Sequence, residues 1–499
     1  MLFVLSFALY TLLIVAIGVY SARLGKRTDE DYFLAGRSLG PWVAALSASA
    51  SSESGWVTLG LVGWAFTSGV TAYWIIPGCL LGFLFNWFVV ADRLRAGAAE
   101  TGALTLPDFL AFHFRERWPL LRIMSVIVIL VSMLLYVAAQ FSAAGKAFEA
   151  SFDAVNYPLG VLIGAAIVLA YTVVGGFRAA CWTDFVQGII MVGTLVLFPA
   201  YLLLSNGGYA FIGAELGEIS GGSLMRFRPE HTGPALLGFL LGSGALGINF
   251  GYPGQPHVLV RFMALRDARA IRIGGIVSAV WAVLVYWGAV TVGLVARALT
   301  EAGAGWTEPL AKQLADKAVD AGETSLVLSA IELAPGVVSG MVLAAVLAAI
   351  CSTADSQLVV AASSVANDLY SRIIEKTGRA SHLLINRTVV FLLGVVAVGL
   401  VINQEINLFQ YVLIYGWAIL GASFGPQLIL VLLWKRATYA GCVAGMIVGF
   451  TTALIWPQIY DPAKFDDIEI YNLPFAFILA LVVNVVVSVL RPGPSNPMT

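Results

Sequence analysis

The sequence contains little charge and few of the residues that form disulfides or metal sites. Only 11% of its 499 residues are charged, against about 25% in an average soluble domain. The net charge of −1 gives no indication of a nucleic-acid partner. The cysteines lie in or beside apolar runs, so the sequence does not predict the disulfide framework of a secreted protein. They are Cys79, Cys181, Cys351 and Cys442.

The motifs that carry enzyme chemistry are also missing. The sequence has no histidine and cysteine cluster with metal-ligand spacing, no phosphate-binding glycine loop and no nucleophile–base pair. We therefore predict that the protein is not an enzyme and has no organic cofactor. Because there is no Walker motif, we expect an ion gradient rather than ATP to supply energy.

Long apolar runs are abundant. The sequence is 59% hydrophobic, with a mean hydropathy of +0.88. A membrane span needs about 20 mostly apolar residues, and we predict an all-α polytopic protein of the plasma membrane with about 13 transmembrane helices. The first run has no basic flank and no small-residue cleavage site, so we expect it to be retained. The predicted spans are about 2–22, 41–66, 70–91, 119–146, 156–174, 182–205, 234–260, 273–297, 328–356, 385–403, 407–433, 437–456 and 472–490.

Basic residues divide the loops into two alternating sets. One set holds 21 of the 28 lysines and arginines and the other holds 7. By the positive-inside rule, this predicts that the N-terminus is outside and the C-terminus inside. The richer set includes Lys26, Arg27, Arg261 and Lys376, and the poorer set includes Lys146, Arg228 and Lys464.

The longest predicted outer loops cover about 206–233 and 298–327. Within the second, residues 307–318 are expected to form a short surface helix that opens at Thr307, with Pro309 in its first turn. Each loop is either a simple connector or a gate over the transport path.

The stretch 47–56 is unusual for a membrane span. It holds five serines, Glu53 and Gly55, although an ionisable side chain at bilayer depth costs about 2.5–3.5 kcal/mol on the insertion scale. We therefore expect this stretch to line an enclosed, wet cavity as a broken helix whose carbonyls can bind a cation. The alternative is a small-residue helix contact with hydroxyls bonded back to the backbone.

A second interruption lies at 247–257, where two prolines and three glycines prevent one regular helix. It comes five spans after the first, which predicts an inverted five-helix repeat with one extra helix before it and two behind. We expect a single transporter domain over 1–499. Its parts are the extra helix 2–22, the first repeat 41–205, the second repeat 234–433 and the two C-terminal helices 437–490.

Further polar groups lie inside predicted spans. Ser352, Asp355 and Ser356 share one helix face, at i, i+3 and i+4, and their oxygens suit a hard cation such as Na⁺. Asp355 could instead mark a plain helix end that pairs with a loop arginine. Asp184 opens the span 182–205, where it belongs either to a cation site or simply to a first helical turn that favours acids.

Three more side chains are candidates of lower specificity. Tyr136 and Gln140 lie one turn apart and either face a cavity or pack between helices. His257 follows the second interruption. We expect it to be a hydrogen-bonded structural group rather than a proton relay.

Motifs spread in order over nearly the whole chain resemble the sodium/solute symporter family. They include DYFLAGRSLGP at 31–41, the stretch 47–56, TLPDF at 105–109, GGF at 175–177 with WTD at 182–184, GQPHVLVRFM at 254–263, 347–358 and 417–441. The resemblance implies about 13 helices in the inverted five-helix repeat fold. It also implies import of a small solute coupled to Na⁺ as the co-transported ion.

The resemblance also implies site residues. The principal sodium site would fall on Ala50, Glu53, Ala349, Ser352 and Thr353. A second cation site, present in some members, would use Asp184, Asp355 and Ser356 together with Ser352 and Thr353. The substrate pocket would use Trp56, Tyr136, Tyr252 and Pro256, with Gln140 and Ile248 as further wall residues.

The chain departs from the proline-transporting members of that family at four of these positions. Those members have aspartate in place of Ser52, methionine in place of Glu53, tryptophan in place of Ile248 and serine in place of Asp355. We therefore expect Na⁺ symport of a small organic solute, most reasonably an amino acid such as proline, by a monomer or weak oligomer. The alternatives are proton coupling, through Glu53 or Asp355, and another solute: an organic acid, a sugar or a different amino acid. Glu53 is either ionised near Na⁺ or protonated away from it.

Overall fold

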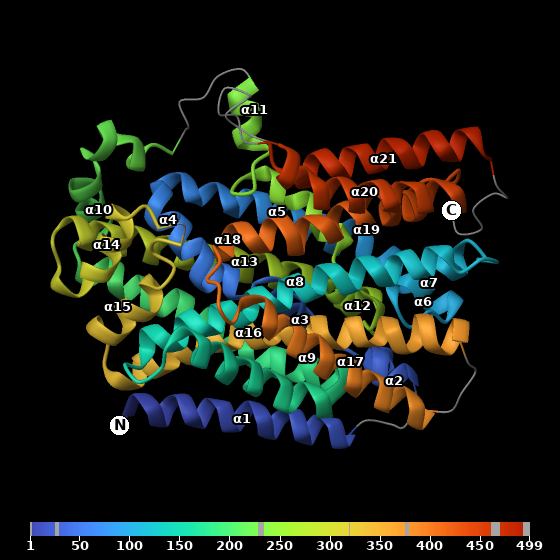
Figure 1. Cartoon of the computed structure of the whole chain (residues 1–499), viewed down its shortest axis with the longest axis horizontal. Helices are drawn as coiled ribbons and strands as arrows, with labels where there is room; N and C mark the ends of the chain where they lie inside the picture. Colours follow the sequence, from blue (N-terminus) through green and yellow to red (C-terminus); the bar gives the residue numbers. More distant parts are fainter. Residues whose placement is uncertain are drawn as a thin grey trace.

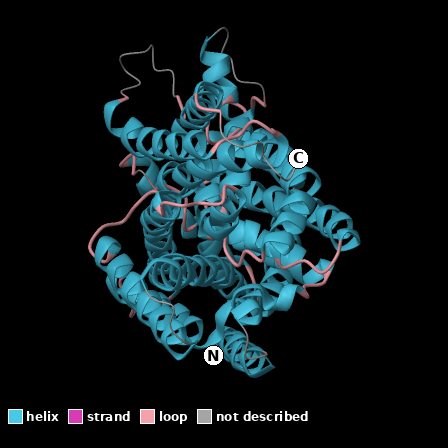
Figure 2. Cartoon of the chain, turned by 90° about the vertical axis from the view of Figure 1, so that its right-hand side faces the viewer, coloured by secondary structure: helices cyan, strands magenta, loops and turns pink. Residues whose placement is uncertain are grey.

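A computed structural model of the chain describes residues 2–24, 29–227, 234–318, 320–374, 379–460 and 470–492. In these ranges the chain consists of helices joined by loops (Figure 2). The described exception is an isolated parallel bridge between Leu39 and Leu265. The predicted all-α class is confirmed.

The longest helices lie roughly along the long axis of the molecule (Figure 1). Nine described helical stretches are long and apolar enough to cross a membrane by length and composition. They include the stretch Trp56–Thr101, which several short helices make up, and do not include α1. The long helices are α1 (Leu2–Leu24), α8 (Leu120–Ser151), α9 (Tyr157–Ser205), α13 (Ala268–Glu301), α16 (Gly336–Ser363), α17 (Arg379–Val401), α19 (Ala418–Leu433), α20 (Tyr439–Ile459) and α21 (Asn472–Leu490).

Shorter helices complete the interrupted spans and cap the two ends of the bundle. The α-helices among them are α2 (Asp29–Leu34), α3 (Pro41–Ser52), α4 (Val62–Ser68), α5 (Ile75–Phe85), α6 (Ala91–Thr101), α7 (Leu106–His113), α10 (Gly208–Leu216), α11 (Pro234–Leu240), α12 (Pro256–Met263), α14 (Glu308–Ala315), α15 (Ser325–Leu333) and α18 (Leu408–Tyr411). The 3₁₀ segments are η1 (Ala35–Arg37), η3 (Gly69–Trp74), η5 (Ile219–Met225), η6 (Leu246–Gly254) and η7 (Gly305–Thr307). The π-helical segments are η2 (Trp56–Leu61), η4 (Asn86–Val90), η8 (Ser364–Ile374) and η9 (Val412–Trp417).

Each predicted span falls on one of these helices or on a broken pair of them, but several boundaries were wrong. The two spans 156–174 and 182–205 are two helices on either side of a kink inside α9, where Gly176 adopts φ 71° and ψ −179°. The second, Gly176–Ser205, is by itself long and apolar enough to cross a membrane. Glycine permits this backbone without a Cβ clash, so the turn between the two helices is short and the second helix begins earlier than residue 182. The span 328–356 is also misplaced, because Pro335 separates α15 from α16 and the helix then continues through Asp355 into η8.

The two ends of the bundle carry different segments. α10, α14 and α15 lie at the left end of Figure 1, where the N-terminus also lies, whereas α6 and α7 lie at the opposite end. The predicted surface helix at 307–318 is present as η7 followed by α14. Thr307 is the last residue of η7 and directly precedes Glu308, the first residue of α14. Of the charges counted in the loops, Lys26, Arg27, Arg228, Lys376 and Lys464 lie outside the described residues.

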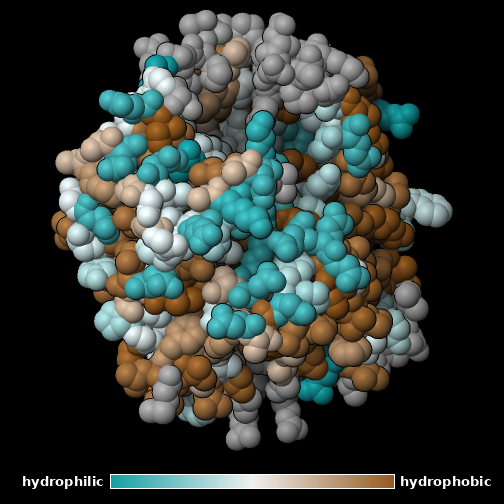
Figure 3. Space-filling view, turned by 60° about the vertical axis from the view of Figure 1, so that its left-hand side comes forward, coloured by the Kyte–Doolittle hydropathy of each residue, from teal (hydrophilic) through white to brown (hydrophobic). Residues whose placement is uncertain are grey.

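The lateral surface is apolar. Leu9 is 67% exposed on α1, Leu384 is 67% exposed on α17 and Leu490 is 75% exposed on α21. Figure 3 shows hydrophilic side chains gathered on the left-hand end of the molecule, with hydrophobic residues around them. Exposed aliphatic side chains along the sides of the bundle, next to a polar end, fit a protein whose sides face lipid.

The two helices of α9 together contact much of the bundle, namely α1, α3, α8, α13 and α16. The contact of α9 with α13 is close because Gly288 faces the backbone of Leu195. A Cβ on Gly288 would come 1.6 Å from the Leu195 carbonyl oxygen. Small residues allow helix backbones to approach in this way inside a membrane.

We predict that Gly288→Ala destabilises the protein by about 1–3 kcal/mol, because the added methyl must push α13 and α9 apart. The matched control is Gly193→Ala on α9, where a Cβ would meet nothing within 4 Å, and where alanine favours the helix. The measurement is the melting temperature of each purified variant. A Gly288→Ala variant as stable as Gly193→Ala would contradict the contact.

Candidate functional site

The first predicted break is present. α3 ends at Ser52, Glu53 leaves the helical conformation with φ −99° and ψ 81°, and helical structure resumes at Trp56. Every residue from Ser47 to Trp56 is buried. The backbone amide of Gly55 donates to Gln140 Oε1 over 3.0 Å, so a neighbouring helix satisfies a group that the break exposes.

The second predicted break is also present, between η6 and α12, and side chains from other helices satisfy its carbonyls. Trp417 Nε1 donates to the Ile248 carbonyl over 3.0 Å, and Asn86 Nδ2 donates to the Tyr252 carbonyl over 2.8 Å. At both breaks, side chains that are distant in the sequence therefore bond to the backbone.

Four of the five predicted ligands of the principal cation site meet where α16 crosses the first break. Ser352 Oγ donates to the carbonyls of Ala50 (2.8 Å) and Ala349 (3.2 Å). Thr353 Oγ1 donates to the Ser51 carbonyl over 3.1 Å and reaches that of Ala50 at 3.4 Å. We call these carbonyl and hydroxyl groups the oxygen cluster. Such oxygens are the ligands that hard cations prefer.

The fifth predicted ligand, Glu53, has its carboxylate elsewhere. The titratable side chains that lie against it are Tyr252 from η6, Tyr286 from α13 and Cys79 from α5. Neither Tyr252 nor Tyr286 meets it with hydrogen-bond geometry, and both carboxylate oxygens lack a partner among the described residues. Only the main chain of Glu53 stays near the oxygen cluster.

The predicted second cation site also converges, but an arginine occupies its centre. Arg261 Nη2 lies 2.9 Å from Asp184 Oδ2 and 2.9 Å from Ser51 Oγ, and it also donates to Ser356 Oγ. Arg261 Nε adds a bond of 3.1 Å to Ser47 Oγ. All five side chains are buried, so a guanidinium supplies the positive charge at this position.

Three expectations about this region were wrong. Arg261 belongs to α12 and is fully buried, so it is not a loop charge. Asp184 lies eight residues past the bend at Gly176, inside α9, so it does not open a helix. Asp355 lies within α16, where its Oδ1 accepts from Ser356 Oγ over 3.1 Å, so it is not a helix end.

The predicted substrate residues divide into two groups. Trp56, Tyr136 and Gln140 contact the first break: Trp56 Nε1 donates to the Ser52 carbonyl (3.1 Å), Gln140 Nε2 to Ser54 Oγ (3.1 Å), and the Tyr136 hydroxyl lies 3.5 Å from Ser54 Oγ. Tyr136 and Gln140 therefore both contact the break.

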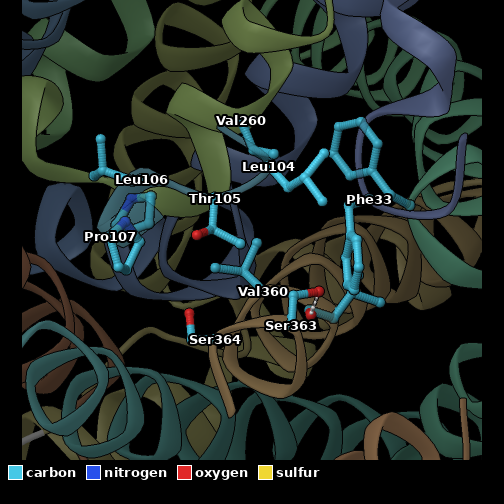
Figure 4. A pocket seen from close by; sticks show the side chains of 12 residues that line it. Phe33, Leu104, Thr105, Leu106, Pro107, Val260, Val360, Ser363 and Ser364 are labelled. Atoms are coloured by element: carbon cyan, nitrogen blue, oxygen red, sulfur yellow. Dashed lines mark hydrogen bonds between the residues drawn. The ribbon is translucent and has the colours of Figure 1, made fainter. Parts of the chain in front are cut away.

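Ile248, Tyr252 and Pro256 form the second group, along the second break. The Tyr252 hydroxyl lies 3.1 Å from that of Tyr286, and Ile248 is fully buried. Pro256 instead lines a cavity toward the α7 end of the bundle (Figure 4). Side chains from α12, the segment 104–107 and the α16–η8 helix surround that cavity, among them Val260, Thr105, Val360 and Ser364.

His257 lies beside the first break. It is fully buried, its ring lies 6.2 Å from that of Tyr136, and neither ring nitrogen has a hydrogen-bond partner among the described residues. The ring lies beside the backbone of Ser51, and its hydrogen-bonded structural role stays a prediction.

Sequence reasoning missed Arg261, Tyr286 and Trp417 as site residues. Arg261 had a signal, because it stands in the apolar string 258–263. Tyr286 and Trp417 had none, since an aromatic residue in an apolar helix usually packs in a core. Their roles follow only from the positions of α13 and η9.

Buried ion pairs close both ends of the bundle. At the α14 end, Lys146 Nζ contacts Asp320 (2.5 Å), Glu323 (2.7 Å) and the Ile406 carbonyl (2.9 Å). Burial raises the pKa of Glu323 to about 7, and the nearby Lys146 acts in the opposite direction. The loop expected to be a connector or a gate is thus anchored to α8.

At the α7 end, Arg122 Nη1 contacts Asp108 over 2.7 Å and Arg372 Nη2 contacts the same carboxylate over 3.2 Å. Arg122 is only 8% exposed and Asp108 is fully buried. This pairing joins α7 to the start of α8 and to η8, so both ends of the site are bounded by charges that hold separate elements together.

Comparisons with known proteins agree with this geometry. Residues 32–449 match the model of the Sodium:solute symporter family. The chain is 37% identical to the high-affinity proline transporter PutP of Bacillus subtilis over 95% of this chain and 96% of that one. It is 35% identical to the sodium/proline symporter of Escherichia coli over 99% of this chain and 94% of that one.

A solved structure shares the fold. A Na⁺-coupled sialic acid symporter, captured in a substrate-bound outward-open state, superimposes with a TM-score of 0.75 at 18% identity, covering 99% of both chains. The likeness supports the inverted-repeat fold expected from the two breaks. The chain is therefore a multi-pass membrane protein and a Na⁺-coupled solute transporter, not an enzyme, and it belongs to the sodium:solute symporter family.

Proposed function

We propose that this symporter couples inward Na⁺ movement to the import of a small zwitterionic amino acid such as proline. The observation that carries the proposal is the segment Ala50–Trp56. On one side its carbonyls meet Ser352 and Thr353, and on the other Gln140 and Trp56 bond to it. The similarity to two proline transporters supports an amino acid as the solute.

In this proposal the oxygen cluster binds Na⁺ through Ala50, Ala349, Ser352 and Thr353, with the main chain of Glu53 beside them. Trp56, Tyr136, Gln140, Ile248, Tyr252 and Pro256 surround the solute. Because one unwound segment contributes to both sites, an ion that orders it also orders the solute pocket. This gives the differential affinity that coupled binding requires.

The second cation site, at Asp184, Asp355 and Ser356, is proposed to alternate between two occupants. Na⁺ can bind there only when the Arg261 guanidinium moves away, since both need the oxygens of Asp184 and Ser356. Movement of α12, which carries Arg261, would then be linked to Na⁺ occupancy.

We further infer that the chain lies in the cytoplasmic membrane with the N-terminus and the α14 end outside and the C-terminus inside, as the basic loops predict. The proposed repeats cover 41–205 and 234–433, between the helix 2–22 and the helix pair 437–490. The proposed functional unit is a monomer or weak oligomer, because one chain holds every proposed ligand.

The experiment that tests the proposal is uptake into proteoliposomes. We expect labelled L-proline, or another amino acid of a panel that also contains sugars and short-chain acids, to accumulate under an inward Na⁺ gradient and not under choline at the same pH. If only sugars or short-chain acids are taken up, the amino-acid proposal is wrong.

We predict that replacing Ser352 and Thr353 together with alanine raises the Na⁺ concentration for half-maximal uptake by about tenfold or more, because two oxygens near the ion are lost. The control is Ser423→Ala, whose hydroxyl bonds only to its own helix, at the Ile419 carbonyl. If the double variant needed the same Na⁺ concentration for half-maximal uptake as the control, Na⁺ would not bind at the oxygen cluster.

We predict that Arg261→Gln costs about 3–5 kcal/mol in stability, because Asp184 remains buried without its cation. Na⁺ should offset part of this loss, so the melting temperature of the variant should rise more with NaCl than that of the parent, relative to choline chloride. Arg266→Gln is the control, since Arg266 is 58% exposed beside Asp267. An equal Na⁺ response in all three proteins would contradict the second site.

A further inference from the structure

Glu53 is the feature of this site that its neighbours leave unexplained. Glu53 is fully buried, with 0% of its surface exposed to solvent. Neither of its carboxylate oxygens has a hydrogen-bond partner among the described residues. The carbonyls of Ala50 and Ser51, just before it, accept hydrogen bonds from α16. Its carboxylate instead faces Tyr252, Tyr286 and Cys79.

Three other buried acids in the described chain are paired with bases. Asp184 has Arg261, Glu323 has Lys146 and Asp108 has Arg122. No described ion pair involves Glu53. A buried polar group without a partner is rare and costly, so a carboxylate in that position indicates a partner that arrives with a ligand.

The two tyrosines beside this carboxylate, Tyr252 and Tyr286, are packed against further aromatic rings. The ring of Trp56 lies 6.0 Å from that of Tyr286, and the Tyr252 ring lies 4.8 Å from that of Trp417 and 5.0 Å from that of Phe83. Aromatic faces attract cations, and a carboxylate among them adds a full negative charge. These groups recognise a positively charged nitrogen and disfavour an anion.

We propose that Glu53 is the counter-ion for the ammonium group of the transported solute, with Trp56, Tyr252 and Tyr286 around it. This rests on the proposed function and narrows it: the solute carries a protonated amine, as an amino acid does, and is neither a sugar nor a simple carboxylic acid. The oxygen cluster keeps the Na⁺, and the carboxylate one turn later takes the charge of the solute.

The test compares two probes that differ at one atom. L-proline carries a ring ammonium, and tetrahydrofuran-2-carboxylate has an uncharged oxygen in its place. Binding of each to the purified full chain is measured at saturating Na⁺ for the parent, Glu53→Gln and the exposed control Glu332→Gln.

We expect Glu53→Gln to weaken proline binding by about 10- to 100-fold. The affinity of the oxygen analogue for Glu53→Gln should equal or exceed its affinity for the parent, because the variant lacks the carboxylate that repels the carboxylate of the analogue. Glu332→Gln should match the parent with both probes. Glu53→Asp keeps the charge and should retain a preference for proline, which provides a second measurement if the glutamine variant does not fold.

Equal weakening of both probes by Glu53→Gln would overturn the inference, since Glu53 would then only shape the pocket. An unchanged affinity of Glu53→Gln for proline would also overturn the inference. If transport by that variant had in addition lost its pH dependence, Glu53 would be a proton carrier instead. Both results leave the proposed amino-acid function intact. That function fails together with the inference only if the parent binds sugars or the oxygen analogue in preference to every amino acid.

Discussion

Two unwound segments at membrane depth constrain the whole structure, because their backbone groups have no water to bond. Gln140 satisfies the amide of Gly55, Trp417 the carbonyl of Ile248 and Asn86 the carbonyl of Tyr252. Each partner is at least 85 residues away in the chain. The breaks can therefore exist only in the assembled bundle, and the side chains that close them also surround the proposed sites.

Buried charged side chains, like buried backbone groups, need partners from elsewhere in the chain. A buried ion is tolerated when a partner is held near it, and the Arg261–Asp184 pair meets this condition with both side chains 0% exposed. The pairs at Lys146 and Arg122 do so at the two ends of the bundle, where each joins elements that are distant in the sequence. Separating these elements would expose both partners to water, so each pair holds its end of the bundle together.

Much of the architecture could be predicted from the sequence. Apolar length located the spans, and the serines of 47–56 and the prolines and glycines of 247–257 located both breaks, because these residues cannot continue a buried regular helix. Helical spacing also placed Ser352 and Ser356 on the face of α16 that meets α3. The errors occurred where a local signal had two meanings: Pro335 separates two helices within one predicted span, and Arg261 stands in an apolar run where it is buried rather than in a loop.

The sequence by itself determined the helices, their interruptions and the oxygen-rich residues of the first break, since these depend on hydropathy, backbone propensity and spacing along one chain. Only the tertiary structure decided which groups meet. It brought Ser352 to the carbonyl of Ala50, filled the second cation site with Arg261, and turned the Glu53 carboxylate toward Tyr252 and Tyr286. The physical reason is that an unwound segment has no fixed helical phase, so the direction of its side chains and carbonyls is set by the helices packed around it.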